Sequence, residues 1–110
     1  MAGADLRGRH CVPCEGGVPK LEATRIADLR REIPSWEIRD DKLHHTFRFR
    51  DFRAAMQFLN RMAEVAEAEG HHPDFAVHYN RVDVTVWTHA IDGLSENDFI
   101  LAAKIDALVP

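Results

Sequence analysis

The sequence predicts one α+β domain, in which a single four-stranded antiparallel sheet has helices packed on one face. Two stretches of the chain alternate apolar and polar residues as half-buried strands do, and each is followed by a stretch with a helical apolar period. A chain of 110 residues has room for one hydrophobic core. We therefore expect the element order α-β-β-α-β-β-α, with two hairpin-like strand pairs forming the sheet and leaving its other face open.

The chain is expected to begin with a flexible tail at residues 1–20, and residues 21–110 are expected to form the domain. The tail holds four of the six glycines and shows no apolar period. Leu21 to Glu32 predicts a short helix that ends near Pro34, because the residue before a proline disfavours helical backbone. Trp36 to Ile38 predicts the first strand.

The next two elements have the strongest patterns. Leu43 to Arg50 alternates as a half-buried strand, with Leu43, His45, Phe47 and Phe49 on one side. From there the period becomes helical, and a long helix is predicted over Asp51 to Glu69, with Asp51 as N-cap and Gly70 as the stop. Its expected buried face consists of Phe52, Ala55, Met56, Leu59, Met62, Ala63 and Ala66.

The second strand pair and the last helix follow. Phe75 to Tyr79 and Arg81 to His89 predict two strands, joined by a tight turn at Asn80-Arg81 because Asn tolerates the positive φ that such a turn needs. Asp92-Gly93 marks a further turn. The residues from Ser95 to Asp98 open the final helix with a capping-box pattern. Leu101, Ile105 and Leu108 continue its buried stripe.

The register of this second hairpin brings histidines together. A loop at Asn80-Arg81 pairs Phe75 with Val86, and the same register pairs His72 with His89. Directly opposed residues have Cβ atoms about 4.5–5.5 Å apart. His71 is adjacent to His72, and Asp98 lies in the first turn of the last helix, which can fold back beside the hairpin. The sequence therefore predicts one site formed by His71, His72, His89 and Asp98.

Composition excludes several classes of protein. The 14 basic and 18 acidic residues give a net charge of -4, which argues against a nucleic-acid-binding face. No apolar stretch approaches the ~20 residues of a membrane span. Met1 to Cys14 lacks the apolar core of a secretory signal. We therefore expect a cytoplasmic protein, without nucleic-acid or membrane partners, whose Cys11 and Cys14 are reduced.

Two kinds of chemistry suit a histidine cluster. The chain has seven histidines, and imidazoles close to a carboxylate suit general acid–base catalysis, because one ring can accept a proton while another donates one. Metal binding is the alternative. Adjacent histidines diverge, however, and Cys11-x-x-Cys14 is only half of a zinc site, so no metal is expected. Structural roles are also possible, with His71 and His72 at a helix end and Asp98 in a cap.

The pattern resembles the signature of the pterin-4a-carbinolamine dehydratases, in their bacterial form. The matching residues are Glu67, His71-His72-Pro73, Tyr79, His89 and Asp98, and the spacings agree at every one. The resemblance runs from about Leu21 to Leu108 and includes Phe47 to Phe52 and Gly93 to Glu96. The N-terminal Cys11 to Pro19 segment is similar to bacterial members as well.

The resemblance implies an activity and a set of site residues. Members remove water from 4a-hydroxytetrahydropterin, the product of aromatic amino acid hydroxylases, and give quinonoid dihydropterin without a metal or separate cofactor. It implies that His71, His72 and His89 exchange protons and that Asp98 supports them. The residues implied to line the substrate pocket are Glu67, Pro73, Phe75 and Thr88. Phe75 departs from the Trp of some members, so its contact with the pterin is expected to differ.

The resemblance also implies a second class of function. Some animal members act as dimerisation partners of a transcription factor, and relatives of this shape serve as interaction or assembly modules without turnover. Fold alone does not separate a binding module from an enzyme. Retention of all four site residues favours the enzyme. The resemblance further implies a homodimer or homotetramer, since family members form dimers or tetramers, and an open sheet face or an apolar helix face would serve for this.

Overall fold

The predicted order of elements is confirmed. In the computed structural model, which describes residues 6–12 and 19–109, two short 3-10 turns, η1 and η2, accompany three helices and four strands. Their bounds are η1 Leu6–Gly8, α1 Ala23–Arg30, β1 Glu37–Arg39, β2 Lys42–Arg48, α2 Phe52–Glu69, β3 Asp74–His78, β4 Arg81–Val86, η2 His89–Ile91 and α3 Glu96–Asp106.

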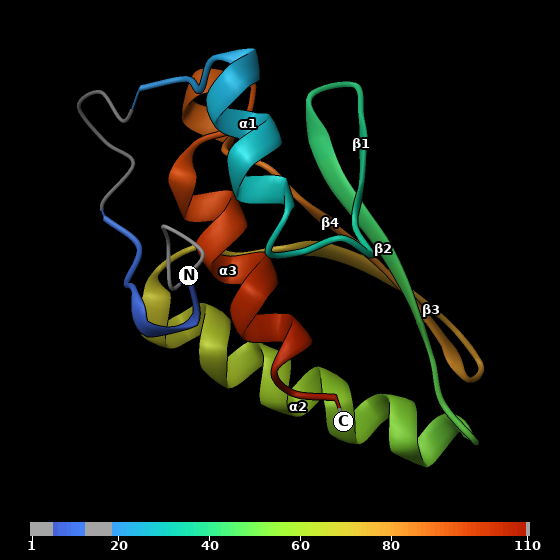
Figure 1. Ribbon diagram of the computed structural model, residues 1–110. Helices are drawn as coiled ribbons and strands as arrows, with labels where there is room; N and C mark the ends of the chain where they lie inside the picture. The colour runs from blue at the N-terminus through green and yellow to red at the C-terminus, as the bar shows by residue number, and fades with distance from the viewer. Residues whose placement is uncertain (1–5, 13–18, 110) are drawn as a thin grey trace.

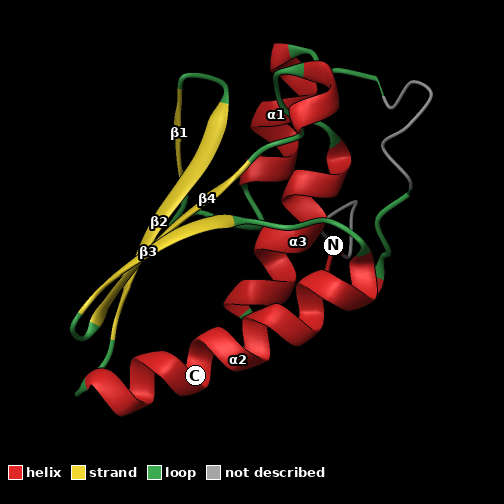
Figure 2. Ribbon diagram, turned by 180° about the vertical axis from the view of Figure 1, so that it is seen from behind, coloured by secondary structure: helices red, strands yellow, loops and turns green. Residues whose placement is uncertain are grey.

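The four strands form one antiparallel sheet in the order β1-β2-β4-β3, as expected. The helices lie together on one side of this sheet, with α3 beside α1 and the long α2 crossing below them (Figures 1 and 2). The strand arrangement makes β1 and β3 the edges and leaves one broad face without a covering helix. In the part of the chain that the structure describes, no helix is both long and apolar enough to span a membrane.

The core lies between the sheet and the helices. Alternation in β4 turns Val82, Val84 and Val86 inward, and all three are buried. Trp36, which precedes β1, is also fully buried and donates its indole N–H to Asp106 Oδ1 at 3.0 Å. Other large side chains buried in this core are Phe58, Phe99, Leu43, Met62 and Leu101.

Helix α2 starts and stops where the sequence predicts, but its buried face is rotated. Asp51 caps it by accepting the Ala54 N–H at 2.8 Å, and Gly70 ends it at φ 65°. Phe52 and Met56, expected in the buried stripe, are 50% and 37% exposed. Ala63 is exposed as well, whereas Phe58 is fully buried. The apolar stripe of α2 is thus wider than the face that the sheet and α3 cover.

The predicted register of the β3–β4 hairpin is wrong by two positions. Phe75 pairs with Val84 and His78 with Arg81, so the loop residues are Tyr79 and Asn80. Tyr79 takes the positive φ of 54°, the role expected for Asn80. Asn80 instead makes two hydrogen bonds with Phe49. Its side-chain amide donates to the Phe49 carbonyl at 2.8 Å, and its backbone carbonyl accepts the Phe49 N–H at 2.8 Å. This contact with the end of β2 fixes the turn.

Strand β4 is also shorter than predicted, so His89 is not a strand residue. The ladder ends at Val86, and His89 opens the turn η2. A pair of backbone hydrogen bonds between Thr88 and Gly93, at 2.9 and 3.4 Å, closes the intervening loop. Asp92 has φ 50°, which agrees with the turn expected at Asp92-Gly93.

Part of the segment expected as a tail packs against the domain. Leu6 is fully buried in the core. The backbone N–H of Cys11 donates to Glu69 Oε1 at 2.7 Å, and Val12 exchanges two hydrogen bonds with the side chain of Asn97, at 2.9 and 2.8 Å. Residues 6–12 therefore join the end of α2 to the start of α3. Cys14 lies outside the described residues.

Candidate active site

The site lies where α2 ends and β3 begins. Because Gly70 adopts a left-handed conformation, the chain leaves the helix axis, and the His71 N–H returns to the Ala66 carbonyl at 3.2 Å. His71 then points inward and is 6% exposed. Pro73 follows before β3 starts. A helix stop and a proline thus place two adjacent histidines at one corner of the fold.

Asp98 holds His71 from behind. The carboxylate is fully buried, and its Oδ1 lies 2.6 Å from His71 Nε2. Its Oδ2 accepts the Thr88 hydroxyl at 2.8 Å and the Ser95 N–H at 2.9 Å, as a capping-box residue does. Asp98 therefore makes the expected cap bonds and contacts His71 at the same time. Because Asp98 accepts every one of these bonds, the His71 ring donates to it and is held in one orientation.

His72 and Glu67 form an exposed pair at the same corner. His72 Nε2 lies 2.7 Å from Glu67 Oε2, and the two side chains are 60% and 77% exposed. Glu67 comes from the last turn of α2, so the helix positions a carboxylate beside the imidazole. A contact this exposed contributes little to stability, and it leaves both side chains open to solvent.

His89 approaches from the other side, although not by the expected pairing. Its side chain is 61% exposed and its Nε2 lies 3.9 Å from Asp74 Oδ2. The indole of Trp87 stacks on the His89 ring with centroids 3.9 Å apart and planes at 29°. The loop that closes at Thr88 and Gly93 positions His89, and the expected strand pairing of His89 with His72 is not formed.

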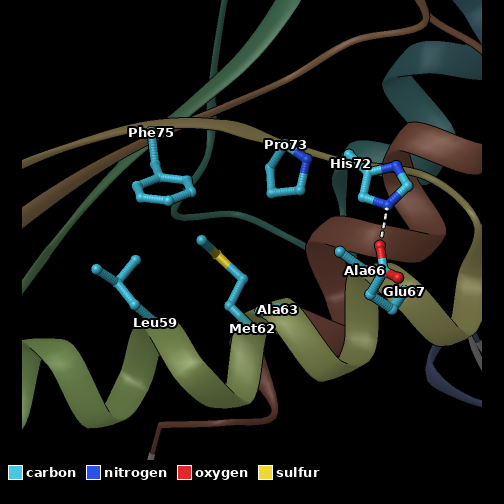
Figure 3. Close-up of a pocket in the computed structure, with 8 residues that line it drawn as sticks. All are labelled: Leu59, Met62, Ala63, Ala66, Glu67, His72, Pro73 and Phe75. Atoms are coloured by element: carbon cyan, nitrogen blue, oxygen red, sulfur yellow. Dashed lines mark hydrogen bonds and ion pairs between the residues drawn. The ribbon is translucent and has the colours of Figure 1, made fainter.

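Two cavities meet at these side chains. An open cleft of about 450 Å³, here called the histidine cleft, is lined by Gly70, His71, His72, Pro73, Asp74, Trp87, His89 and Ala90. A second cavity of about 150 Å³, here called the apolar groove, is lined by Leu59, Met62, Ala63, Ala66, Glu67, His72, Pro73 and Phe75. Figure 3 shows Phe75 and Pro73 facing Leu59 and Met62 of α2 across this groove. His72 and Pro73 belong to both walls.

The predicted residues thus occupy three positions. His71, His72 and His89 line the histidine cleft, and Glu67, Pro73 and Phe75 line the apolar groove. Asp98 and Thr88 lie behind His71, out of both walls, and Thr88 is only 1% exposed. Its hydroxyl bonds Asp98 and Ser95.

Sequence reasoning missed two residues of the cleft, Asp74 and Trp87. Trp87 Nε1 donates to Asp74 Oδ2 at 3.1 Å. The signal that could have found them was strand alternation: Trp87 falls on the open face of β4, one residue before Thr88, which points inward. A large aromatic side chain beside a candidate histidine was the available clue.

The described residues contain no grouping of three or more histidine, cysteine or carboxylate side chains suited to a metal ion. Cys11 Sγ donates to the Asn97 carbonyl oxygen at 3.5 Å.

Comparison with known proteins places the chain in a family. A profile of the pterin 4 alpha carbinolamine dehydratase family matches residues 19–108. The chain belongs to this family. It is 48% identical over 106 residues to a protein of Rubrobacter xylanophilus, covering 96% of this chain and 99% of that one. It is 50% identical over 105 residues to a protein of Stenotrophomonas maltophilia, covering 94% and 90%. Both relatives carry provisional names as pterin-4-alpha-carbinolamine dehydratases.

Solved structures agree with this membership. A protein of Brucella melitensis, described as a transcriptional coactivator/pterin dehydratase, is similar with a TM-score of 0.80 at 33% identity, over 84% of this chain and all of that one. A pterin dehydratase-like protein described as a RuBisCO assembly factor in the alpha-carboxysome is similar with a TM-score of 0.56 at 24% identity, over 66% and 84%. The second likeness concerns the fold alone.

Proposed function

We propose that the chain dehydrates a 4a-hydroxytetrahydropterin to the quinonoid dihydropterin by histidine acid–base catalysis. The observation that carries the proposal is the buried His71–Asp98 pair, 2.6 Å apart, at the back of a cleft that also exposes His72 and His89. Family membership supplies the substrate class. The substrate would come from an aromatic amino acid hydroxylase, and the product would go to a reductase.

The reaction needs two proton transfers on neighbouring atoms. Hydroxide is a poor leaving group, so an acid protonates the 4a-oxygen as the C4a–O bond breaks. A base takes the N5 proton as the C4a–N5 double bond forms, and the products are water and the quinonoid pterin. Proton transfer by a positioned side chain contributes about 10²–10⁴ in rate. We assign the acid to His89 and the base to the His71–His72 pair on the opposite flank of the cleft.

Each histidine has an environment that suits its role. His71 is buried and oriented by Asp98, which also stabilises the imidazolium that forms when His71 accepts a proton. His72 and His89 are mostly exposed, so both can exchange protons with water between turnovers. The proposal involves no metal and no further cofactor.

The test is the decay of enzymatically generated 4a-hydroxytetrahydropterin, followed by absorbance. We expect the wild type to accelerate the decay, the acceleration to survive EDTA, and His89→Ala to reduce kcat by about 10²-fold or more. His78→Ala is the matched control, because His78 is an exposed histidine of β3 outside both cavities. If a folded wild type does not accelerate the decay, the proposal is contradicted. If EDTA abolishes the acceleration, a metal-dependent mechanism replaces the histidine mechanism.

A non-catalytic interaction module is the second candidate, favoured by a specific observation. Phe52, Met56, Phe75 and Tyr79 are large apolar or aromatic side chains between 37% and 65% exposed. Exposed apolar groups of this size on neighbouring elements are typical of interaction surfaces. If the wild type binds no pterin and does not accelerate the decay, this candidate takes precedence.

A further inference from the structure

The side chain of His89 lacks the buried carboxylate partner that orients His71. His71 is held by a buried carboxylate, whereas the His89 side chain is 61% exposed on a three-residue turn. An exposed side chain samples several rotamers, and fixing one costs entropy. An acid that must meet a particular oxygen atom needs a group that holds it in place.

Trp87 is placed to hold it. The indole and imidazole rings stack with centroids 3.9 Å apart and planes inclined by 29°. Contact over a whole ring face restricts rotation of His89 about its side-chain bonds, because any other rotamer loses the stacking. Trp87 is one of the residues that line the histidine cleft, so this contact lies at the site.

Trp87 is itself fixed by two further contacts. Its indole N–H donates to Asp74 Oδ2 at 3.1 Å, and the Lys42 ammonium lies 4.5 Å from the ring centroid. The same Asp74 oxygen is 3.9 Å from His89 Nε2. A single carboxylate oxygen therefore accepts the indole N–H and lies near the imidazole that stacks on the indole.

Backbone alternation explains why this arrangement mirrors the one behind His71. Trp87 and Thr88 follow β4 directly and point to opposite sides. Thr88 turns inward and bonds Asp98, which holds His71. Trp87 turns outward, bonds Asp74 and holds His89. Two consecutive residues thus orient histidines on the two flanks of one cleft.

We propose that Trp87 and Asp74 are positioning residues for His89 in the dehydration, an inference that rests on the proposed function. Trp87 supplies the stacking surface and Asp74 keeps the indole at the correct angle. Because neither residue is assigned a bond to the substrate, their loss lowers kcat and leaves KM nearly unchanged. A Trp87 that stacked on the pterin would show the opposite pattern.

The experiment combines an NMR measurement with kinetics on four variants. Trp87→Leu removes the stack, Trp87→Phe keeps a ring but not the N–H, and Asp74→Ala removes the anchor. His78→Ala is the control, because it removes an exposed ring from the far end of the same hairpin, outside both cavities. The NMR readout is the upfield ring-current shift of the His89 ring protons, assigned with His89→Ala, which needs no substrate.

We expect the shift in the wild type and in His78→Ala, a reduced shift in Trp87→Phe and Asp74→Ala, and none in Trp87→Leu. We expect kcat of Trp87→Leu to fall about tenfold, with KM within about twofold of the wild type. An active wild type without the shift overturns this inference alone, as does a Trp87→Leu variant with unchanged kcat or with only KM raised. A wild type that shows the shift without activity overturns the proposed function instead.

Discussion

At the scale of single residues, the account depends on what lies behind each histidine. The sequence could predict that His71 and Asp98 meet, because a helix stop and a capping box bring both into reach. It could not predict that Asp98 contacts His71 from a fully buried position, or that the Thr88 hydroxyl donates to Asp98 instead of lining the pocket. Those roles depend on the direction of each side chain, which packing decides.

Asp98→Asn tests the support of His71. The amide keeps the size of the carboxylate but removes the charge that stabilises the His71 imidazolium and fixes its donor nitrogen. We expect kcat for 4a-hydroxytetrahydropterin to fall on the order of 10²-fold, with the fold retained by circular dichroism.

Asp106→Asn is the matched control for that substitution, on the same helix. Burial raises the pKa of Asp106, even though the Trp36 N–H bond and the charges of His45 and Arg7 act to lower it. A carboxyl group whose pKa is raised by folding makes the folded protein less stable as pH rises. The loss occurs between the ordinary pKa of 3.8 and the raised pKa of the folded state. We expect Asp106→Asn to keep full activity and to be at least as stable as the wild type at pH 7. A similar loss of kcat in both variants contradicts the special role of Asp98.

At the scale of elements, local patterns predicted where helices begin and end but not the β3–β4 register. Asp51 and Gly70 act within one turn of α2, so the sequence around them was sufficient. The hairpin loop moved by one residue because Asn80 binds Phe49, a residue 31 positions away. No local propensity carries that information. The same limit applies to residues 6–12, whose partners Glu69 and Asn97 are far along the chain.

Glu69 connects the end of α2 to this N-terminal segment. Removing its carboxylate should therefore change the stability of the protein in a way that depends on pH. Burial by itself raises the pKa of Glu69, but the Cys11 N–H and the side chains of His10 and Lys104 outweigh burial and hold the pKa below its ordinary value. Because folding lowers this pKa, ionised Glu69 stabilises the folded protein above the ordinary pKa of 4.5. This stabilisation is lost as pH falls through the pKa of the folded state.

We therefore expect Glu69→Gln to lower the free energy of unfolding by about 1–2 kcal/mol at pH 7, measured by urea denaturation. The difference from the wild type should shrink below pH 4.5. Glu64→Gln, an exposed change on the same helix, is the control. A difference that is constant from pH 7 to pH 3.5 would show that the charge of Glu69 is not what matters.

At the scale of the whole molecule, the fold class and sheet were predictable, but the extent of the core was not. Alternation and helical period identify apolar faces without saying what covers them. Phe52 and Met56 were assigned to the core by period alone, and they are 50% and 37% exposed in the single chain. Together with the uncovered edge strand β3, they indicate a face that a second copy can cover.

We expect the wild type to sediment as a homodimer or homotetramer. Met56→Glu should shift it towards smaller species, because a charge in an apolar interface is costly to desolvate. Gln57→Glu adds the same charge one position along α2 and should leave the mass unchanged. A monomeric wild type, or a Met56→Glu variant whose sedimenting species has the same mass as the wild type, would show that this face is not the subunit interface.

The central claim is that His71, held by Asp98, transfers a proton in the dehydration. It is tested most directly by the kcat of His71→Gln for 4a-hydroxytetrahydropterin, measured beside the wild type on protein shown to be folded. Glutamine is polar and close to imidazole in length but cannot act as an acid or base near neutral pH. The account predicts a loss of about 10²–10⁴-fold. A loss of less than about tenfold would mean that the chemistry does not pass through His71.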